Sequence, residues 1–406
     1  MILLRSLTLR GRVFLCVGIA TAVGALLVGE RDLLRVGVFV VALPVISALT
    51  VARVPRNVTH TRALAPARVM AGGDSRVLIR LTNASPVLPT GTVLVADTLP
   101  YALGEPPRFN AGRLRPGQSR ELTYRVRSHV RGRYPIGPVA LHFRDPLGCV
   151  QLVRHVGASM ALLVTPTIVA LPGPVPRGDS ADSGESRARS MSSSGEDDAV
   201  PREYRHGDDV RRVHWRSTAR RGELMVRREE QPWREHSAVL LDLRESAHAG
   251  AGPDSSLEAA VSMAGSIAVH LLGRGQELRF LTNDTEITAL RREDAVLDAL
   301  AVARPSSSTG LHTGIAMLEN AAATGRGLAI AVLGAVGEGE AEALAGLRGA
   351  REGRCVAVLC RGAAWPAPAA RERARELLTG AGWRVLEPDT AQELPGAWRG
   401  LAARAG

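Results

Sequence analysis

The sequence contains no lysine, so its formal net charge of +11 comes entirely from arginine. Aromatic residues are also scarce, at 3% of the chain, and they leave few platforms on which nucleic-acid bases could stack. The arginines are spread along the whole chain, and neither a zinc-finger nor an RNA-recognition signature is present. A membrane-associated nucleic-acid binder is therefore the least favoured of the functions considered, and we expect no nucleic-acid partner. Basic segments beside a membrane, which are attracted to anionic lipid headgroups, explain the charge better.

Cysteine is almost as rare, and the four cysteines show neither a CxxC pair nor the spacing of a His/Cys metal site: Cys16, Cys149, Cys355 and Cys360. Unpaired cysteines indicate a reducing compartment. The sequence also lacks a G-x-x-x-x-G-K-[ST] phosphate loop, a G-x-S-x-G nucleophile elbow and an H-E-x-x-H zinc motif. We therefore expect a non-enzymatic protein, and any use of ATP must belong to a partner.

Long apolar runs, in contrast, are present at the amino terminus. Residues 13–29 carry no charge, and residues 33–52 carry only Arg35; a short polar turn separates the two runs. Each run has roughly the ~20 residues that a helix needs to cross a bilayer. A signal peptide would not be followed at once by a second run, and no convincing cleavage site intervenes. Residues 1–54 are therefore predicted to form a basic lead and a transmembrane helical hairpin.

The arginines around these runs predict the orientation of the hairpin. Three arginines precede it and three follow it: Arg5, Arg10, Arg12, Arg53, Arg56 and Arg62. By the positive-inside rule both ends then lie in the cytoplasm. We expect a two-pass protein of the cytoplasmic (inner) cell membrane with its soluble domains in the cytoplasm, in agreement with the unpaired cysteines.

The remaining sequence changes its pattern three times. Residues 55–170 alternate over short runs between turn residues, which predicts a β-sandwich-like domain. Residues 171–199 are rich in Gly, Ser, Asp and Pro and are predicted to be a flexible linker. Residues 235–406 alternate strand-like and helix-like segments, which favours a doubly wound α/β domain. Ligands of such domains bind at the carboxyl ends of the strands.

Residues 200–234, between the linker and the α/β domain, contain a distinctive motif. Residues 200–224 read VPREYRHGDDVRRVHWRSTARRGEL. This segment closely resembles the hallmark of the bacterial family catalogued as domain of unknown function 58. The matching positions are Arg202, Tyr204, Gly207, Asp208, Arg212, His214, Trp215, Ala219, Arg220, Gly222 and Leu224.

The resemblance implies a whole architecture and a partner. Members of this family have a pair of membrane helices, a β-rich region, the hallmark and a carboxy-terminal domain similar to von Willebrand factor type A. They are commonly encoded beside AAA+ ATPases of the MoxR type, which suggests such a partner here. The arginines, carboxylates and aromatics of the hallmark indicate either a recognition patch for an acidic partner or a phosphate, or an internal ion-pair network that docks the segment on the α/β domain.

Type A domains often hold Mg²⁺ through D-x-S-x-S at the end of the first strand. The corresponding segment keeps Asp242 and Ser246 but has Arg244 in place of the first serine, and Thr309 is the candidate ligand from a later loop. A guanidinium there would repel the cation and pair with Asp242. We therefore expect no cofactor, and an adaptor is favoured over the alternative, a metal-assisted hydrolase that uses Asp242 and His214.

Overall fold

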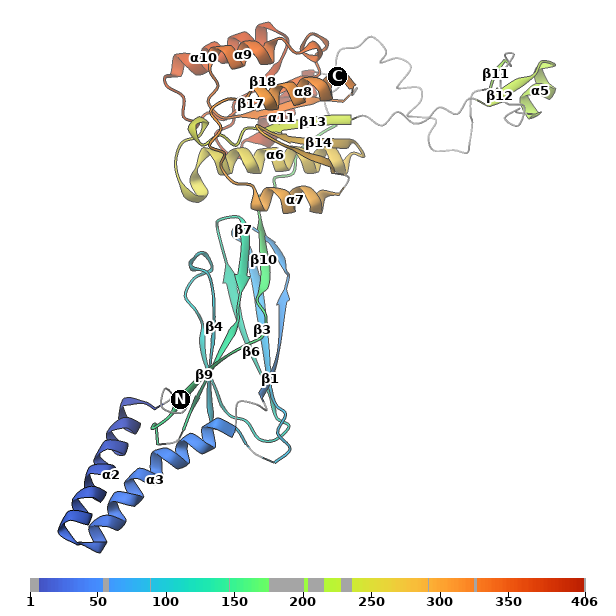
Figure 1. Ribbon diagram of the computed structural model, residues 1–406. Helices are drawn as coiled ribbons and strands as arrows, with labels where there is room; N and C mark the ends of the chain where they lie inside the picture. The colour runs from blue at the N-terminus through green and yellow to red at the C-terminus, as the bar shows by residue number, and fades with distance from the viewer. Residues whose placement is uncertain are drawn as a thin grey trace. The chain divides into compact units, whose positions relative to one another are not determined.

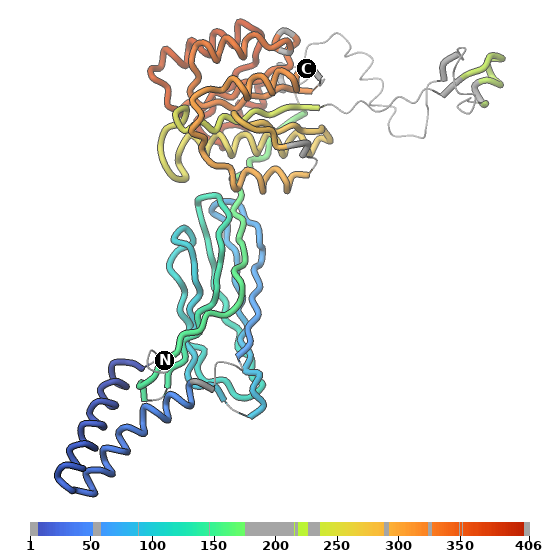
Figure 2. The backbone as a smooth tube through the Cα atoms, viewed as in Figure 1, coloured from blue at the N-terminus to red at the C-terminus, as the bar shows by residue number. Residues whose placement is uncertain are grey.

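The computed structural model describes residues 7–53, 58–87, 89–145, 147–174, 201–203, 215–227, 236–290, 292–324 and 327–404 (Figures 1 and 2). Its contacts divide the chain into two compact units. The first contains Met1–Thr167 with Leu300–Ala303, and the second contains Ile168–Ala299 with Arg304–Gly406.

Two long apolar helices open the first unit, as the sequence predicts: α2 (Leu9–Val28) and α3 (Arg31–Arg53). Both are long and apolar enough to cross a membrane, and only 17% and 22% of their apolar windows is buried within the protein. A third helix, α6 (Ser256–Gly273), also meets the length and hydropathy requirement, but 61% of it is buried. Because α6 packs on the strands of the second unit, it is a core helix of that domain.

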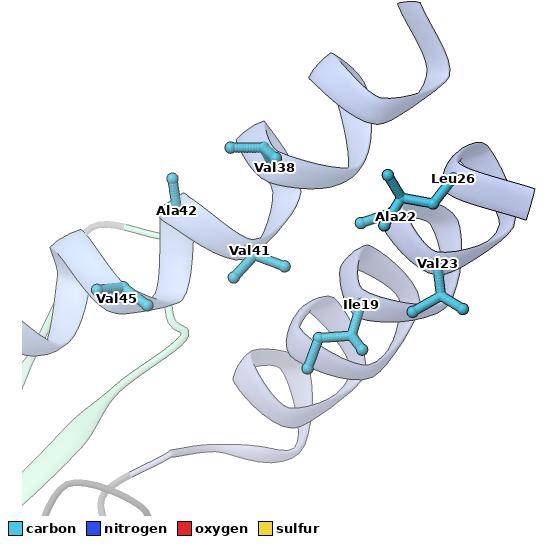
Figure 3. A pocket seen from close by; sticks show the side chains of 8 residues that line it. All are labelled: Ile19, Ala22, Val23, Leu26, Val38, Val41, Ala42 and Val45. Carbon is cyan, nitrogen blue, oxygen red and sulfur yellow. The ribbon is translucent and has the colours of Figure 1, made fainter. Parts of the chain in front are cut away.

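Glycines allow α2 and α3 to pack closely. A Cβ on Gly18 would lie 2.7 Å from Val41 Cγ2, and one on Gly37 would lie 2.7 Å from Ala22 N. Small residues at helix contacts are typical of membrane helices, where close backbone approach supplies the packing energy. Beside this contact lies an aliphatic groove of about 390 Å³ between the two helices (Figure 3). Its lining offers no polar group for catalysis.

The rest of the first unit is built of strands. They are β1 (Val58–Ala65), β2 (Arg68–Met70), β3 (Asp74–Asn83), β4 (Thr92–Asp97), β5 (Arg108–Arg113), β6 (Ser119–Arg127), β7 (Gly132–Ile136), β8 (Val139–Arg144), β9 (Gln151–Val156) and β10 (Met160–Thr165). They pair as three sheets, in the orders β1-β3-β6, β2-β10-β7 and β5-β4-β8-β9. Inward-facing residues of all three sheets share one apolar core.

A buried ion pair crosses this core. Arg62 of β1 donates from Nη2 to Asp97 Oδ1 of β4 at 2.5 Å, and the Tyr124 hydroxyl of β6 donates to Asp97 Oδ2 at 2.6 Å. The side chains of Arg62 and Asp97 are 4% and 0% exposed. Burial and the Asp97 carboxylate raise the pKa of Tyr124, so its hydroxyl remains a donor. The three side chains hold two of the sheets together.

The second unit contains a doubly wound α/β domain. Its strands are β13 (His236–Leu241), β14 (Glu277–Thr282), β15 (Glu286–Leu290), β16 (Ala329–Leu333), β17 (Cys355–Leu359) and β18 (Arg384–Leu386). Its helices are α6, α7 (Glu293–Val302), α8 (His312–Thr324), α9 (Glu338–Ala345), α10 (Pro368–Gly380) and α11 (Leu394–Arg404). The strand order is β15-β14-β13-β16-β17-β18, and only β15 runs antiparallel to its neighbour.

Helices cover both faces of this sheet (Figure 1). Ala238 and Leu240 of β13 share a core with residues of α8, α9 and α10. Val239 and Leu241 point the opposite way, because side chains alternate along a strand, and they are fully buried as well. The helix α6, which contacts β13, β14 and β16, covers that second face. Burial on both faces explains why the strands read as continuous apolar runs.

The described part of the hallmark segment forms two short paired strands and one short helix. β11 (Pro201–Glu203) pairs antiparallel with β12 (Met225–Arg227), and α5 (Trp215–Arg221) lies between them in sequence. Gly222 ends the helix with a φ of 77°, in the left-handed region that favours glycine.

Candidate functional site at the carboxyl edge of the sheet

The topology marks one place in the α/β domain where a ligand would be expected. The chain leaves β13 for β14 on one side and later returns to β16 on the other side of β13. Ligands of doubly wound sheets bind at such a switch point, outside the carboxyl ends of the strands. Here Asp242 directly follows β13 and Gly334 directly follows β16. Gly334 N donates to Asp242 Oδ2 at 3.3 Å, so the two strand ends are in direct contact.

Arg244 occupies this switch point. Its Nε donates to Asp242 Oδ1 at 2.9 Å and its Nη2 to Asp242 Oδ2 at 2.8 Å, a bidentate pair. Nη2 also donates to the carbonyl oxygen of Ala335 at 3.1 Å, on the loop that follows β16. The Asp242 side chain is 0% exposed and that of Arg244 is 5% exposed. The pair that the sequence suggested is therefore present, buried, and bonded to both strand ends.

A second carboxylate completes the cluster. Arg244 Nη1 donates to Glu340 Oε1 at 2.6 Å. Glu340 lies in the first turn of α9, where its Oε2 accepts from Gly337 N at 3.1 Å, and its Oε1 also accepts from Leu311 N, at 3.1 Å. One guanidinium thus lies between two carboxylates, one directly after β13 and one on α9.

The electrostatics of the cluster favour a permanent charge on Arg244. Burial acts to lower the pKa of this group, but hydrogen bonds and the charges of Asp242 and Glu340 outweigh burial and raise the pKa above its ordinary value. The guanidinium of Arg244 thus finds its hydrogen-bond acceptors within its own chain. Its side chain occupies the switch point.

His248 holds the backbone of Asp242 in place. Its Nε2 lies 2.9 Å from the carbonyl oxygen of Asp242, which only accepts, so Nε2 carries the proton. In the neutral ring Nδ1 then accepts from Ser256 Oγ at 3.1 Å. Burial, together with the nearby charge of Arg244, lowers the pKa of His248. The neutral imidazole therefore fixes the backbone on which Asp242 stands.

The residues at this edge do not fit a divalent cation. Both Asp242 oxygens accept hydrogen bonds from Arg244, and the candidate ligands Ser246 and Thr309 are exposed side chains with no hydrogen bond to Asp242 within the described part of the chain. Across the described residues no group of three or more His, Cys, Asp or Glu side chains is placed to hold a metal. Cys360, close to Asp242, is fully buried, and burial raises its pKa to about 12, so it is a neutral thiol.

The hallmark is only partly described. Tyr204, Gly207, Asp208, Arg212 and His214 lie outside the described residues, and Arg202 is placed only as a backbone position in β11. The predicted internal ion-pair network of this segment stays a prediction.

The described end of the hallmark presents exposed side chains. Trp215 at the start of α5 is 69% exposed, and Arg220 in its last turn is exposed as well. Met225 is buried, and its N–H is bonded to Thr218 Oγ1 at 3.0 Å. The helix α5 is thus hydrogen-bonded to the start of β12, and its described side chains Trp215, Arg220 and Arg221 are exposed.

Sequence reasoning missed Glu340 and His248. Glu340 carries one signal, because an acid three residues after Gly337 is typical of a helix start. Its contact with Arg244 spans 96 residues and depends on the strand order, which the local pattern does not contain. His248 carries no signal of its role.

A family model matches one part of the chain. Residues 200–358 match the family model described as "Protein of unknown function DUF58". That region includes the hallmark and most strands of the α/β sheet, so the match is to this part of the chain. A search of the curated proteins found no match.

Solved structures give only weak likenesses. The chain is similar to the CARDB domain of a Pyrococcus furiosus protein in complex with di-metal ions, at 15% identity, 26% of this chain, 91% of that chain and a TM-score of 0.20. It is also similar to the Pseudomonas fluorescens alkylpurine DNA glycosylase AlkC, at 17% identity, 33% of this chain, 39% of that chain and a TM-score of 0.20. At such TM-scores neither likeness carries a conclusion about this chain.

Proposed function

We propose that this protein is a membrane-anchored, non-enzymatic adaptor that binds other proteins and works with a MoxR-type AAA+ ATPase in the assembly or maturation of complexes. The observation that carries the proposal is the Arg244 cluster. Its guanidinium fills the switch point where an α/β domain of this topology would hold a cofactor or metal. An edge that is closed by the chain's own side chains suits a binding domain better than a catalytic one.

Three further features support this function. The α/β domain has the strand order and antiparallel edge strand that we associate with a von Willebrand factor type A-like domain, the architecture that the family resemblance implies. The helices α2 and α3 supply an anchor, with both soluble units on the cytoplasmic side. On α5, the exposed Trp215 and Arg220 are residue types that dominate the energy of protein interfaces.

The test is affinity purification of the tagged full chain from membranes of its own host, with identification of the co-eluting proteins. Wild type is expected to recover an AAA+ ATPase, and Arg220→Glu, which reverses a hallmark charge on α5, is expected to lose it. Arg221→Glu is the matched control, because this neighbour is also exposed on α5 but is not a hallmark position. Failure of the wild type to recover an ATPase after gentle crosslinking would contradict the proposal.

A further inference from the structure

The amino end of α2 is bonded to the turn between β8 and β9. Thr8, the first cap of the helix, donates from its backbone N to the carbonyl oxygen of Cys149 at 3.0 Å, and from Oγ1 to the carbonyl oxygen of Gly148 at 2.6 Å. Leu7 forms an antiparallel bridge with Val150. The start of a membrane helix and a turn of the β-sheet are thus one hydrogen-bonded structure (Figure 2).

The two segments approach each other as closely as backbones can. A Cβ on Gly11 would lie 2.2 Å from the carbonyl oxygen of Cys149, so no other residue fits at this position without separating them. Gly11, Cys149 and Val150 are buried at the contact. The contact therefore fixes where the β8–β9 turn lies along the axis of α2.

When α2 spans a membrane, this position places the β8–β9 turn at the surface of the bilayer. The uncharged run of α2 begins at Val13 and ends with the helix at Val28, so at 1.5 Å per residue it spans about 24 Å, most of the roughly 30 Å of hydrocarbon. The turn beside Thr8 and Gly11 then lies at the level of the lipid headgroups. Within it, Leu147 is 50% exposed.

The same turn is ordered without exposing an acid. Asp145 accepts from Leu147 N at 3.1 Å and from Val150 N at 2.7 Å, and it is only 4% exposed. Its carboxylate is therefore used within the turn and does not face the membrane.

Exposed arginines gather at this end of the sheet. Arg10 and Arg12 lie in the first turn of α2, and Arg10 Nη1 is 3.9 Å from where a Cβ on Gly148 would stand. Arg144 ends β8 and Arg113 ends β5, and both pair with Thr92 of β4, so they share one edge. All four are exposed, and within the described residues none is in an ion pair with a carboxylate.

We propose that this end of the β-rich region, formed by the β8–β9 turn with Arg10, Arg12, Arg113 and Arg144, binds the headgroups of anionic phospholipids, with Leu147 in contact with the interface. Guanidinium groups bind phosphate through paired hydrogen bonds, and arginines near an anionic surface are strongly attracted to it. The sheet is thereby held on the membrane and does not hang from a free linker. The inference rests on α2 being a membrane span, which the experiment checks separately.

The experiment uses the full chain in lipid nanodiscs, with one cysteine-attached fluorophore and quenching by nitroxide lipids. The background is Cys16→Ser, because the other three cysteines are buried. The test label is at Leu147→Cys. The matched control is Tyr101→Cys, because Tyr101 is fully exposed. It follows Asp97, which lies at the opposite end of β4 from the Thr92–Arg144 pair. Thr92 and Asp97 are about 17 Å apart along the strand.

In nanodiscs that contain phosphatidylglycerol, we expect a headgroup nitroxide to quench the label at 147 and not that at 101. Each arginine removed, as in Arg113→Ser or Arg144→Ser, should weaken the binding of phosphatidylglycerol headgroups at this surface by about fivefold. Equal quenching at 147 and 101, or equal quenching at 147 by a nitroxide carried on phosphatidylglycerol and by one carried on phosphatidylcholine, would overturn the proposal. A third label, Val23→Cys, must be quenched by a mid-chain nitroxide; if it is not, the span itself is wrong and not only the surface contact.

Discussion

Removing the guanidinium of Arg244 gives the sharpest test of how the switch point is held. In Arg244→Met the aliphatic stem remains, but Asp242, which is 0% exposed, loses its bidentate partner. Breaking a buried ion pair on one side costs about 3–5 kcal/mol, a large part of the roughly 5–15 kcal/mol that stabilises a typical domain. For a domain of this size the unfolding midpoint should fall by roughly 6–20 °C.

Tryptophan fluorescence is the natural assay, because none of the five tryptophans lies before residue 215. Trp383 and Trp398 are buried in the α/β domain, so their emission reports the unfolding of this domain in the full chain. Arg361→Met, which breaks an ion pair that is about half exposed, is the control and should cost at most about 1 kcal/mol. If Arg244→Met loses no more free energy of unfolding than the control Arg361→Met, the reasoning is refuted.

Three further predictions follow from the same structure. Arg244→Ser removes the resident cation, so millimolar Mg²⁺ should raise the unfolding midpoint of this variant and leave that of wild type unchanged; an equal response of the two proteins would contradict the account of the site. Burial holds the pKa of His248 below its ordinary value of 6.5, so the unfolded chain binds more protons and stability falls as the pH drops below that value; in His248→Gln, pH titration of the unfolding free energy should show a shallower fall. Gly37→Leu would drive a side chain into Ala22 and part the two membrane helices, which spin-label distances would show as a longer separation, whereas Gly24→Leu, with no atom within 4 Å, should leave the separation unchanged.

Buried parallel strands were the part of the fold that could be predicted well from sequence. The strand β17 is a run of five apolar residues and has the bounds that its pattern predicts, and β18 does as well. The apolar spacing of residues 338–351 predicts one helix over that range, but α9 ends at Ala345, where Gly346 caps it and a 3-10 turn follows. The helical spacing of apolar residues does not reveal this end, because it continues through the 3-10 turn.

Two elements escaped prediction because their local sequence argues against them. The edge strand β15 (Glu286–Leu290) is not one of the continuous apolar runs that mark the buried strands, and its pairing with β14 supplies what its pattern lacks. The helix α11 contains Pro395 and two glycines near Trp398, residues that disfavour a helix interior. Trp398 is nevertheless 0% exposed, so tertiary burial stabilises a helix that propensity alone would not predict.

The position of Glu340 explains why the switch point should not itself recognise an acidic ligand. A bound metal at such an edge would keep a coordination position open toward solvent, and an incoming carboxylate could fill it. Here the guanidinium faces Asp242 on one side, and Glu340 lies against its remaining side at 2.6 Å. The place of an external carboxylate is thus taken by a residue of α9. We therefore propose that a partner of this protein binds elsewhere, and Trp215 and Arg220 of α5 are two of the exposed hallmark residues that it could contact.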